Sequence, residues 1–262
     1  IICTFINILG QIVKISFYLI NLDSSVERLN KADTELSKQK INYTRISAVD
    51  GRKLELSSYS NYDSKRSHIF TGRDLIGAEI GCYLSHKKAV ETFLLSGSDY
   101  GVILEDDLRL NNDFNQKVTE IIRWLENNKY TDWNVINLGA KKKKLTSKIA
   151  EFGNYELLNA YYFPILAIGL IWSRKGAQDF LEKINDQPIF MPIDVELQAW
   201  LSKNGKGLSV YPALVLQNGS ESDIDAGTLI NQQKSLRADR FFPRQKRMWM
   251  NKWNACKKLL EK

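Results

Sequence analysis

The chain has 262 residues, of which 44% are hydrophobic and 11% aromatic, and this composition excludes an intrinsically disordered or fibrous protein. The net charge of +7 comes from one region, because residues 235–262 hold nine basic side chains against two acidic ones. The neutral remainder argues against a broad basic face, so nucleic acid is not an expected partner.

The three cysteines, Cys3, Cys82 and Cys256, are odd in number, widely spaced and in no metal-ligand pattern. They indicate free thiols in a reducing compartment rather than a disulfide framework. The apolar opening lacks a basic start and a small-residue cleavage site, so no signal peptide is expected. We interpret residues 1–12 as an upstream or non-native extension before a natural start at Val13, since no methionine opens the sequence.

From Val13 onward, short apolar runs bounded by turn residues alternate with segments whose apolar residues follow the helical period. Strands are expected over residues 15–21, 42–46, 100–104, 134–138, around 160–162, 167–172 and 208–216. Helices are expected over residues 26–39, 78–95, 114–127, 174–184 and 194–202. This order predicts one α/β domain over residues 13–234, a Rossmann-type αβα sandwich with a mostly parallel central sheet.

Three segments have no regular pattern. Residues 52–73 are polar and rich in Ser and Tyr, which indicates an irregular loop beside a site. The lysine run 141–144 is typical of a solvated loop, with a phosphate-facing role as the alternative. Beyond residue 216 we expect a loop and then the basic, aromatic tail 235–262.

Three consecutive carboxylates, Glu105, Asp106 and Asp107, follow the apolar strand 100–104. Ligands of open α/β sheets bind at the carboxyl ends of the strands. Adjacent acids repel one another unless a cation compensates them, and Mg²⁺ and Mn²⁺ take oxygen ligands that they often share with substrate phosphates. The cluster therefore indicates a metal–diphosphate site, and a solvated acidic turn that caps the next helix is the alternative.

Other short blocks accompany this cluster. They are Tyr-Leu-Ile-Asn-Leu-Asp at 18–23 with Glu27 and Arg28 behind it, Ala-Val-Asp-Gly at 48–51, the run 77–86 and Leu-Glu-Asp-Asp at 104–107. Their order and spacing resemble glycosyltransferase family 25, the bacterial lipooligosaccharide galactosyltransferase type, which is also similar to collagen-modifying galactosyltransferase domains. Weaker similarity continues through 173–177 and Asp194, so the resemblance covers residues 15–225.

The resemblance implies a GT-A-like fold, a UDP-sugar donor with galactose preferred, and an inverting transfer to a lipooligosaccharide or lipopolysaccharide core acceptor. It also implies Mn²⁺, or Mg²⁺, bridging the two phosphates and stabilising charge on the UDP leaving group. Glu105 and Asp107 point to one side of an extended chain and are the expected metal ligands. The side chain of Asp106 is expected to point away from the metal and to support the donor site.

An inverting transfer needs a carboxylate that takes the proton of the attacking acceptor hydroxyl. Asp194 is the expected base, because it follows Pro192 at a junction between extended chain and helix, where a side chain can project into a cleft. Glu196 is the reserve. A plain N-cap role is the alternative for Asp194.

Asn21, Asp23 and Arg28 are expected at the nucleotide end, where Asn and Asp can bond uracil or ribose and Arg can neutralise phosphate. Turn formation and a surface ion pair are the alternatives. Asp50 and Gly51 are expected close to the donor, because glycine lacks a Cβ, with an ordinary turn as the alternative.

Glu79 and His86 belong to the block 77–86 and are expected to bind the donor, with a satisfied helix residue as the alternative for His86. Many GT-A enzymes add a late histidine as a metal ligand, and no histidine follows His86 in this sequence. Gln217, Asn218, Asp223 or water is expected to take that place.

The tail 235–262 combines basic residues with Phe241, Phe242, Trp249 and Trp253, a composition that suits attachment to an anionic membrane surface. A solvated helix and a nucleic-acid patch are the alternatives. We therefore expect a cytoplasmic protein that is peripheral on the inner face of the bacterial inner membrane.

Together these patterns predict a metal-dependent, inverting hexosyltransferase, with β-galactosyl transfer favoured. A non-catalytic sugar-nucleotide or glycan-binding protein of the same fold is the main alternative, because the late histidine is missing. A nucleotidyltransferase, which also uses clustered carboxylates, is a third interpretation.

Overall fold

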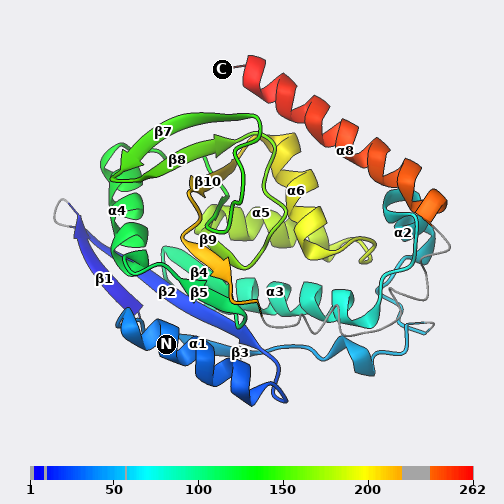
Figure 1. Ribbon diagram of the computed structural model, residues 1–262, viewed down its shortest axis with the longest axis horizontal. Helices are drawn as coiled ribbons and strands as arrows, with labels where there is room; N and C mark the ends of the chain where they lie inside the picture. The colour runs from blue at the N-terminus through cyan, green and yellow to red at the C-terminus, as the bar shows by residue number, and fades with distance from the viewer. Residues whose placement is uncertain (1–2, 9–10, 57, 220–236, 262) are drawn as a thin grey trace.

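The computed structural model describes residues 3–8, 11–56, 58–219 and 237–261. A nine-stranded sheet runs through the middle of the molecule, with helices around it (Figure 1). The strands of this sheet are β1 (Cys3–Ile8), β2 (Gln11–Asn21), β3 (Thr44–Ser47), β4 (Tyr100–Glu105), β6 (Val135–Asn137), β7 (Thr146–Phe152), β8 (Tyr155–Ala160), β9 (Gly169–Ser173) and β10 (Gly207–Tyr211).

Most strands of the sheet share one direction. The order across the sheet is β1-β2-β4-β9-β6-β10-β8-β7, and β3 also pairs with β2. The pairings place β2, β3, β4, β6, β7 and β10 in one direction and β1, β8 and β9 in the other. The predicted mostly parallel sheet is confirmed, with antiparallel β9 inserted between β4 and β6.

Side chains that alternate along the strands build one hydrophobic core on each face of the sheet. On β2, Phe17 and Leu19 belong to the first core, whereas Tyr18 and Ile20 belong to the second. The helices of the first face are α1 (Val26–Lys38) and α4 (Phe114–Asn127), and those of the second are α3 (Gly77–Leu95), α5 (Arg174–Asn185) and α6 (Ile193–Asn204). These three layers confirm the predicted αβα sandwich.

Two strand predictions need correction. The single strand expected over 208–216 is two strands, because β10 ends at Tyr211 before Pro212, which has no N–H to donate to a neighbour. After it, β11 (Val215–Gln217) pairs with β5 (Leu108–Leu110) in a separate two-stranded sheet. The strand expected around 160–162 lies earlier in the chain, as β8.

The segment 52–73 is more regular than expected, because it contains helix α2 (Ser64–Thr71). The Asp63 side chain caps this helix by accepting a hydrogen bond from the backbone N–H of Arg66. The lysine run 141–144 is exposed, as expected of a solvated loop. Cys82 and Cys256 are free, and the side chain of Cys3 lies outside the described residues.

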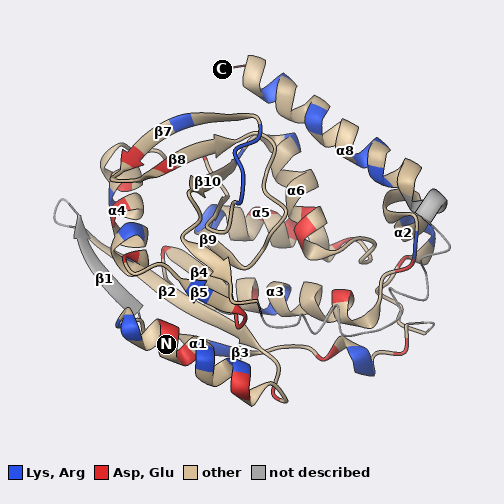
Figure 2. Cartoon of the chain, viewed as in Figure 1, with Lys and Arg blue, Asp and Glu red and all other residues tan. Residues whose placement is uncertain are grey.

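The basic tail forms a long helix, α8 (Arg237–Leu260). The sequence pattern did not decide between a loop and a solvated helix there. This helix lies against α6 and α2 (Figure 1), so the tail packs on the domain. Basic residues recur along it (Figure 2). None of the helices within the described residues is long and apolar enough to span a membrane.

Three glycines allow the loop after β3 to touch the first turns of α3. A Cβ on Gly51 would lie 1.8 Å from the carbonyl oxygen of Gly77 and 2.7 Å from the backbone nitrogen of Gly81. A Cβ on Gly81 would lie 2.5 Å from the carbonyl oxygen of Val49. The obstructing atoms are backbone, so the glycines determine how closely this loop approaches α3.

We expect Gly51→Ala to lower the free energy of unfolding by about 2 kcal/mol or more, because the added methyl group must separate the loop from α3. Gly97→Ala is the comparison, since nothing lies within 4 Å of its Cβ position and only its positive φ of 70° opposes the change. That substitution should cost about 1 kcal/mol. Urea denaturation of both variants measures the difference, and equal losses would contradict the close-contact explanation.

Candidate functional site

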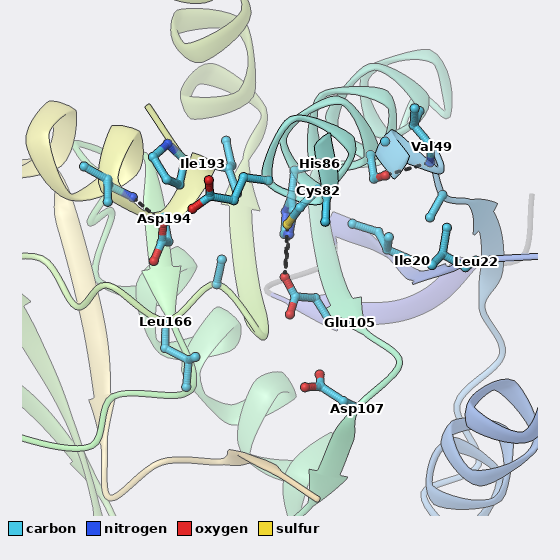
Figure 3. Close-up of a pocket in the computed structure, with 18 of the residues that line it drawn as sticks. Ile20, Leu22, Val49, Cys82, His86, Glu105, Asp107, Leu166, Ile193 and Asp194 are labelled. Carbon is cyan, nitrogen blue, oxygen red and sulfur yellow. Dashed lines mark hydrogen bonds and ion pairs between the residues drawn. The ribbon is translucent and has the colours of Figure 1, made fainter. Parts of the chain in front are cut away.

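A cavity of about 560 Å³ opens at the carboxyl ends of parallel strands β2 and β4. Side chains from segments far apart in the sequence line it, and Figure 3 shows those of β4, α3 and α6 facing one another across the opening. This is the edge of an open α/β sheet at which ligands bind. The cavity is therefore our candidate site.

Glu105, the last residue of β4, is held by α3. Its Oε1 atom lies 2.9 Å from Nε2 of His86 and 3.9 Å from Sγ of Cys82 (Figure 3). Each of these three residues offers one potential ligand atom, and the three atoms lie within 4.8 Å of one another. The three side chains could therefore hold a metal ion. Burial raises the pKa of the Cys82 thiol well above its usual value, which keeps the sulfur protonated and leaves oxygen as the better ligand for a hard cation.

Asp106 is turned away from its two neighbours and tied to other elements. It accepts a hydrogen bond of 2.6 Å from the Asn21 amide at the end of β2, and it is ion-paired with Arg28 of α1. Burial raises the pKa of Asp106, whereas the bonds from Asn21 and Arg28 oppose that shift. Asn21, Arg28 and Asp106 all line the cavity, and the role of Asp106 in supporting a donor site stays a prediction.

Asp107 is a buried carboxylate whose hydrogen-bonding capacity is only partly used. It is only 7% exposed, and its buried Oδ1 atom has no hydrogen-bond partner among the residues that the structure describes. Burial, and then the nearby charge of Glu105, raise the pKa of Asp107 to about 6. A cation shared by Glu105 and Asp107 would satisfy the orphaned oxygen and relieve the repulsion, so the residues present fit a hard divalent ion.

Asp194 comes from the first turn of α6, across the cavity from Asp107 (Figure 3). It accepts a hydrogen bond of 2.8 Å from the backbone N–H of Val195. Burial raises the pKa of Asp194 to about 6, and the charges of Glu105 and Glu79 add to this effect. The plain N-cap alternative is wrong, because the cap position of α6 is Pro192 and Asp194 already lies inside the helix.

Two of the predicted site residues do not reach the cavity. Glu196 is buried against α5 in an ion pair with Lys183, because two residues along a helix turn a side chain to a different face. Asp23 points to solvent, where it accepts hydrogen bonds from Arg45 at 2.6 Å and Ser47 at 2.9 Å. Neither Glu196, the predicted reserve base, nor Asp23, a predicted nucleotide contact, is among the residues that line the cavity.

Asp50, Gly51 and Glu79 line the cavity and also have structural partners. Asp50 caps the short helix η1 (Gly51–Lys53) and is ion-paired with Arg52. Gly51 is needed for contact with α3, so its missing Cβ does not by itself indicate a donor contact. Glu79 accepts hydrogen bonds from Arg73, one of 2.7 Å, and from the backbone N–H of Ile76.

Among the residues considered for the late ligand, Gln217 lines the cavity, whereas the backbone N–H of Asn218 donates to the carbonyl oxygen of Asp107 at 2.8 Å. Asp223 lies outside the described residues. Sequence reasoning missed the arginines that line the cavity, Arg52, Arg73, Arg244 and Arg247. No local pattern marks them, since α8 reaches the cavity only through tertiary packing.

Comparisons with known proteins agree on one family. The sequence profile of "Glycosyltransferase family 25 (LPS biosynthesis protein)" matches residues 14–197. Procollagen galactosyltransferase 1 of Danio rerio is 25% identical over 193 residues, which are 71% of this chain and 31% of that protein. The chain thus spans about a third of the length of the curated relatives that it matches.

Two further matches are a relative whose name marks it as probably inactive and a solved glycosyltransferase structure. "Probable inactive glycosyltransferase 25 family member 3" of Bos taurus is 27% identical over 183 residues, covering 68% of this chain and 30% of that protein. Among solved structures, a glycosyltransferase involved in glycosylation of the major capsid of PBCV-1 covers 82% of this chain and 98% of its own, at 10% identity. Its TM-score is 0.38, too low to support an argument from shape.

We expect Asp107→Asn to raise the free energy of unfolding of the metal-free protein by about 2 kcal/mol at pH 7. The folded pKa of about 6 lies above the ordinary value of 3.8, so ionised Asp107 opposes folding at neutral pH. The gain should shrink as pH falls through 6 and vanish below about 4, where the wild-type carboxyl is neutral in both states.

Urea denaturation at pH 7 and at a pH below about 4 measures this difference in stability, and Asp23→Asn is the control. A hydrogen bond from Arg45 lowers the pKa of Asp23, so its ionised form favours folding at neutral pH. Asp23→Asn should therefore lower stability at pH 7 rather than raise it. A loss of stability in Asp107→Asn at pH 7 would contradict our account of the cavity.

Proposed function

Since this chain belongs to glycosyltransferase family 25, we propose that it moves a hexose, preferably galactose, from a UDP-sugar to a hydroxyl of a lipooligosaccharide or lipopolysaccharide core, with inversion. The observation that carries the proposal is that carboxylates lie on two opposite sides of one cavity. Glu105 and Asp107 are on one side, and Asp194 is on the other. A group-transfer enzyme needs a place for the leaving group and a base for the nucleophile, and this cavity offers both.

The names of the relatives support parts of the proposal to different degrees. The procollagen galactosyltransferases support galactose as the transferred sugar, and the family description supports a lipopolysaccharide acceptor. Procollagen is the acceptor in the names of those longer relatives, of which this chain spans about a third. Transfer to a bacterial core saccharide is our proposal for this chain.

Glu105 and Asp107 would hold Mn²⁺, or Mg²⁺, at the donor diphosphate. When bound, this ion supplies a Lewis acid that stabilises negative charge on the departing UDP. His86 orients Glu105 through its Nε2 atom, and Asp106 fixes the end of β4 to Asn21 and Arg28. The protein thus contributes a rigid pair of oxygen ligands whose positions do not depend on the substrate.

Asp194 would act as the base. As the acceptor oxygen bonds to the anomeric carbon, the bond from that carbon to the diphosphate breaks, and Asp194 takes the proton of the acceptor hydroxyl. A pKa of about 6 leaves its carboxylate mostly ionised at pH 7, yet makes it a stronger base than an ordinary aspartate. Its place across the cavity from Asp107 suits attack from the face opposite the leaving group.

A non-catalytic sugar-nucleotide-binding protein is the second candidate, because some family members are called probable inactive. That alternative keeps donor binding and lacks turnover. A turnover measurement with parallel binding data therefore separates the two.

The test is release of UDP from a panel of UDP-sugars by the purified protein with Mn²⁺ and a truncated lipooligosaccharide. We expect release with one preferred donor, its loss on chelation of Mn²⁺, and a decrease of about a hundredfold or more in Asp194→Asn. The wild-type rate should fall as pH drops below about 6, since protonated Asp194 cannot accept a proton.

Glu182→Gln is the matched control, because this exposed residue of α5 loses a carboxylate outside the cavity. It should keep the wild-type rate, and Asp194→Asn should bind UDP as tightly as wild type. Binding of UDP without release from any donor or acceptor would favour the non-catalytic alternative. Unchanged turnover in Asp194→Asn would remove Asp194 from the mechanism.

We also propose that α8 attaches the protein to the cytoplasmic face of the bacterial inner membrane. Phe242, Trp249, Trp253 and Leu260 follow one another at intervals of seven, four and seven residues, which places them on one face of the helix. Trp249 and Trp253 are 69% and 75% exposed. Lysines 246, 252 and 257 are exposed near this aromatic face, so charge and apolar area together suit an anionic bilayer.

The double variant Trp249→Ser, Trp253→Ser should weaken binding to phosphatidylglycerol vesicles by about tenfold or more in a sedimentation assay. Leu95→Ser is the control, because Leu95 is 85% exposed on α3, away from α8. High salt should weaken wild-type binding, since the lysines contribute electrostatic attraction. Equal binding of the double variant and wild type would argue against attachment through α8.

A further inference from the structure

One side of the cavity carries arginines that the proposed chemistry does not use. Arg73 comes from the loop before α3, and Arg244 and Arg247 come from α8. The three lie in one electrostatic group, because the charges of Arg244 and Arg73 both act on Arg247. Such a concentration of guanidinium groups beside a substrate cavity is suited to an anion.

The charges in this group are unequally compensated. Arg73 is bound by both oxygens of Glu79, so its charge is balanced. Within the part of the chain that the structure describes, neither Arg244 nor Arg247 forms an ion pair with a carboxylate. The Nη1 atom of Arg247 donates to the carbonyl oxygen of Phe70 at 2.7 Å, which fixes the guanidinium without neutralising it.

Burial makes the free charge of Arg247 costly. Burial lowers the pKa of its guanidinium and the neighbouring Arg244 lowers it further, whereas the charges of Asp194 and Tyr162 oppose this shift. A partly buried cation that keeps donors available is stabilised when an anion arrives with matching acceptors. The arrangement therefore suits an anionic ligand, since no carboxylate among the described residues is paired with Arg247.

The position of the arginines identifies the substrate to which that anion belongs. Arg247 acts electrostatically on Asp194, the proposed base, which must touch the acceptor hydroxyl. In the proposed function the donor diphosphate has other partners, namely Glu105 and Asp107 through the metal ion, and Arg28, which is ion-paired with Asp106 between them. We therefore propose that Arg244 and Arg247 bind an anionic substituent of the acceptor sugar, a phosphate ester or a carboxylate, next to the hydroxyl that is glycosylated.

This inference rests on the proposed function and specifies its acceptor. It also separates the two faces of α8. Arg247, Asn251 and Ala255 follow at intervals of four residues and face the domain, where Asn251 and Ala255 are buried, whereas Trp249 and Trp253 face solvent. A lipid headgroup held by the outer face is thus not the anion at Arg247.

The test uses equilibrium dialysis to measure the binding of two labelled anions. Sulfate represents a phosphate ester, and acetate represents a carboxylate. The protein is loaded beforehand with UDP and Mn²⁺, so that the donor side is filled. We expect one of the two anions to bind, and Arg244→Gln to weaken that binding about tenfold. Arg247→Lys, which keeps the charge, should retain more binding than Arg247→Gln.

Lys257→Gln is the matched control, because it removes one positive charge from the outer face of the same helix. It should leave anion binding unchanged. An equal loss in Lys257→Gln, or no binding of either anion, would overturn the inference while UDP release from the donor still stands. A parallel dialysis without UDP separates the two substrates, because an anion that binds only when UDP is left out would assign the arginines to the donor. A protein that binds no UDP would instead refute the proposed function.

Discussion

The site is governed by the repulsion among carboxylates that are gathered in one poorly solvated cavity. Glu105 and Asp107 project from the end of β4, and Asp194 enters from α6, while burial raises the pKa of the two aspartates to about 6. A protein that needed only stability would place such groups in water. Packing around them maintains their convergence, and the cation proposed above would relieve the repulsion.

Contacts between elements hold these carboxylates in place. The tie of Asp106 to Asn21 and Arg28 joins β4, β2 and α1 directly behind the acidic pair. The contact of Gly51 with Gly77 and Gly81 holds the loop after β3 against α3, the helix that carries His86. The acidic pair on β4 and the helix that carries His86 therefore belong to one packed framework, and their spacing follows from packing.

Much of this framework could be predicted from local patterns. The bounds predicted for the helix 114–127 agree with those of α4, because helical periodicity is a local property of the sequence. The acidic cluster was expected at a strand end because an apolar run leads directly into it. Patterns of neighbouring residues could not show that Glu196 pairs with Lys183 or that Arg247 reaches the cavity, since both depend on which helices pack together. For the same reason Asp23 was expected at the nucleotide end, although Arg45 of β3 holds it in solvent.

The inserted strand β9 has a consequence for how the chain folds. Among the described strands of the main sheet, β9 is the only hydrogen-bonded link between the β2–β4 part and the β6–β10 part. Its partners Tyr100–Glu105 and Val135–Asn137 both precede it in the chain, so each must wait, without a neighbour on that edge, until residues 169–173 arrive between them. Long-range closure of this kind slows folding and leaves strand edges open to wrong partners. The pairing that joins the two parts of the sheet is thus also the one that secures β4, and with it the carboxylates at its end.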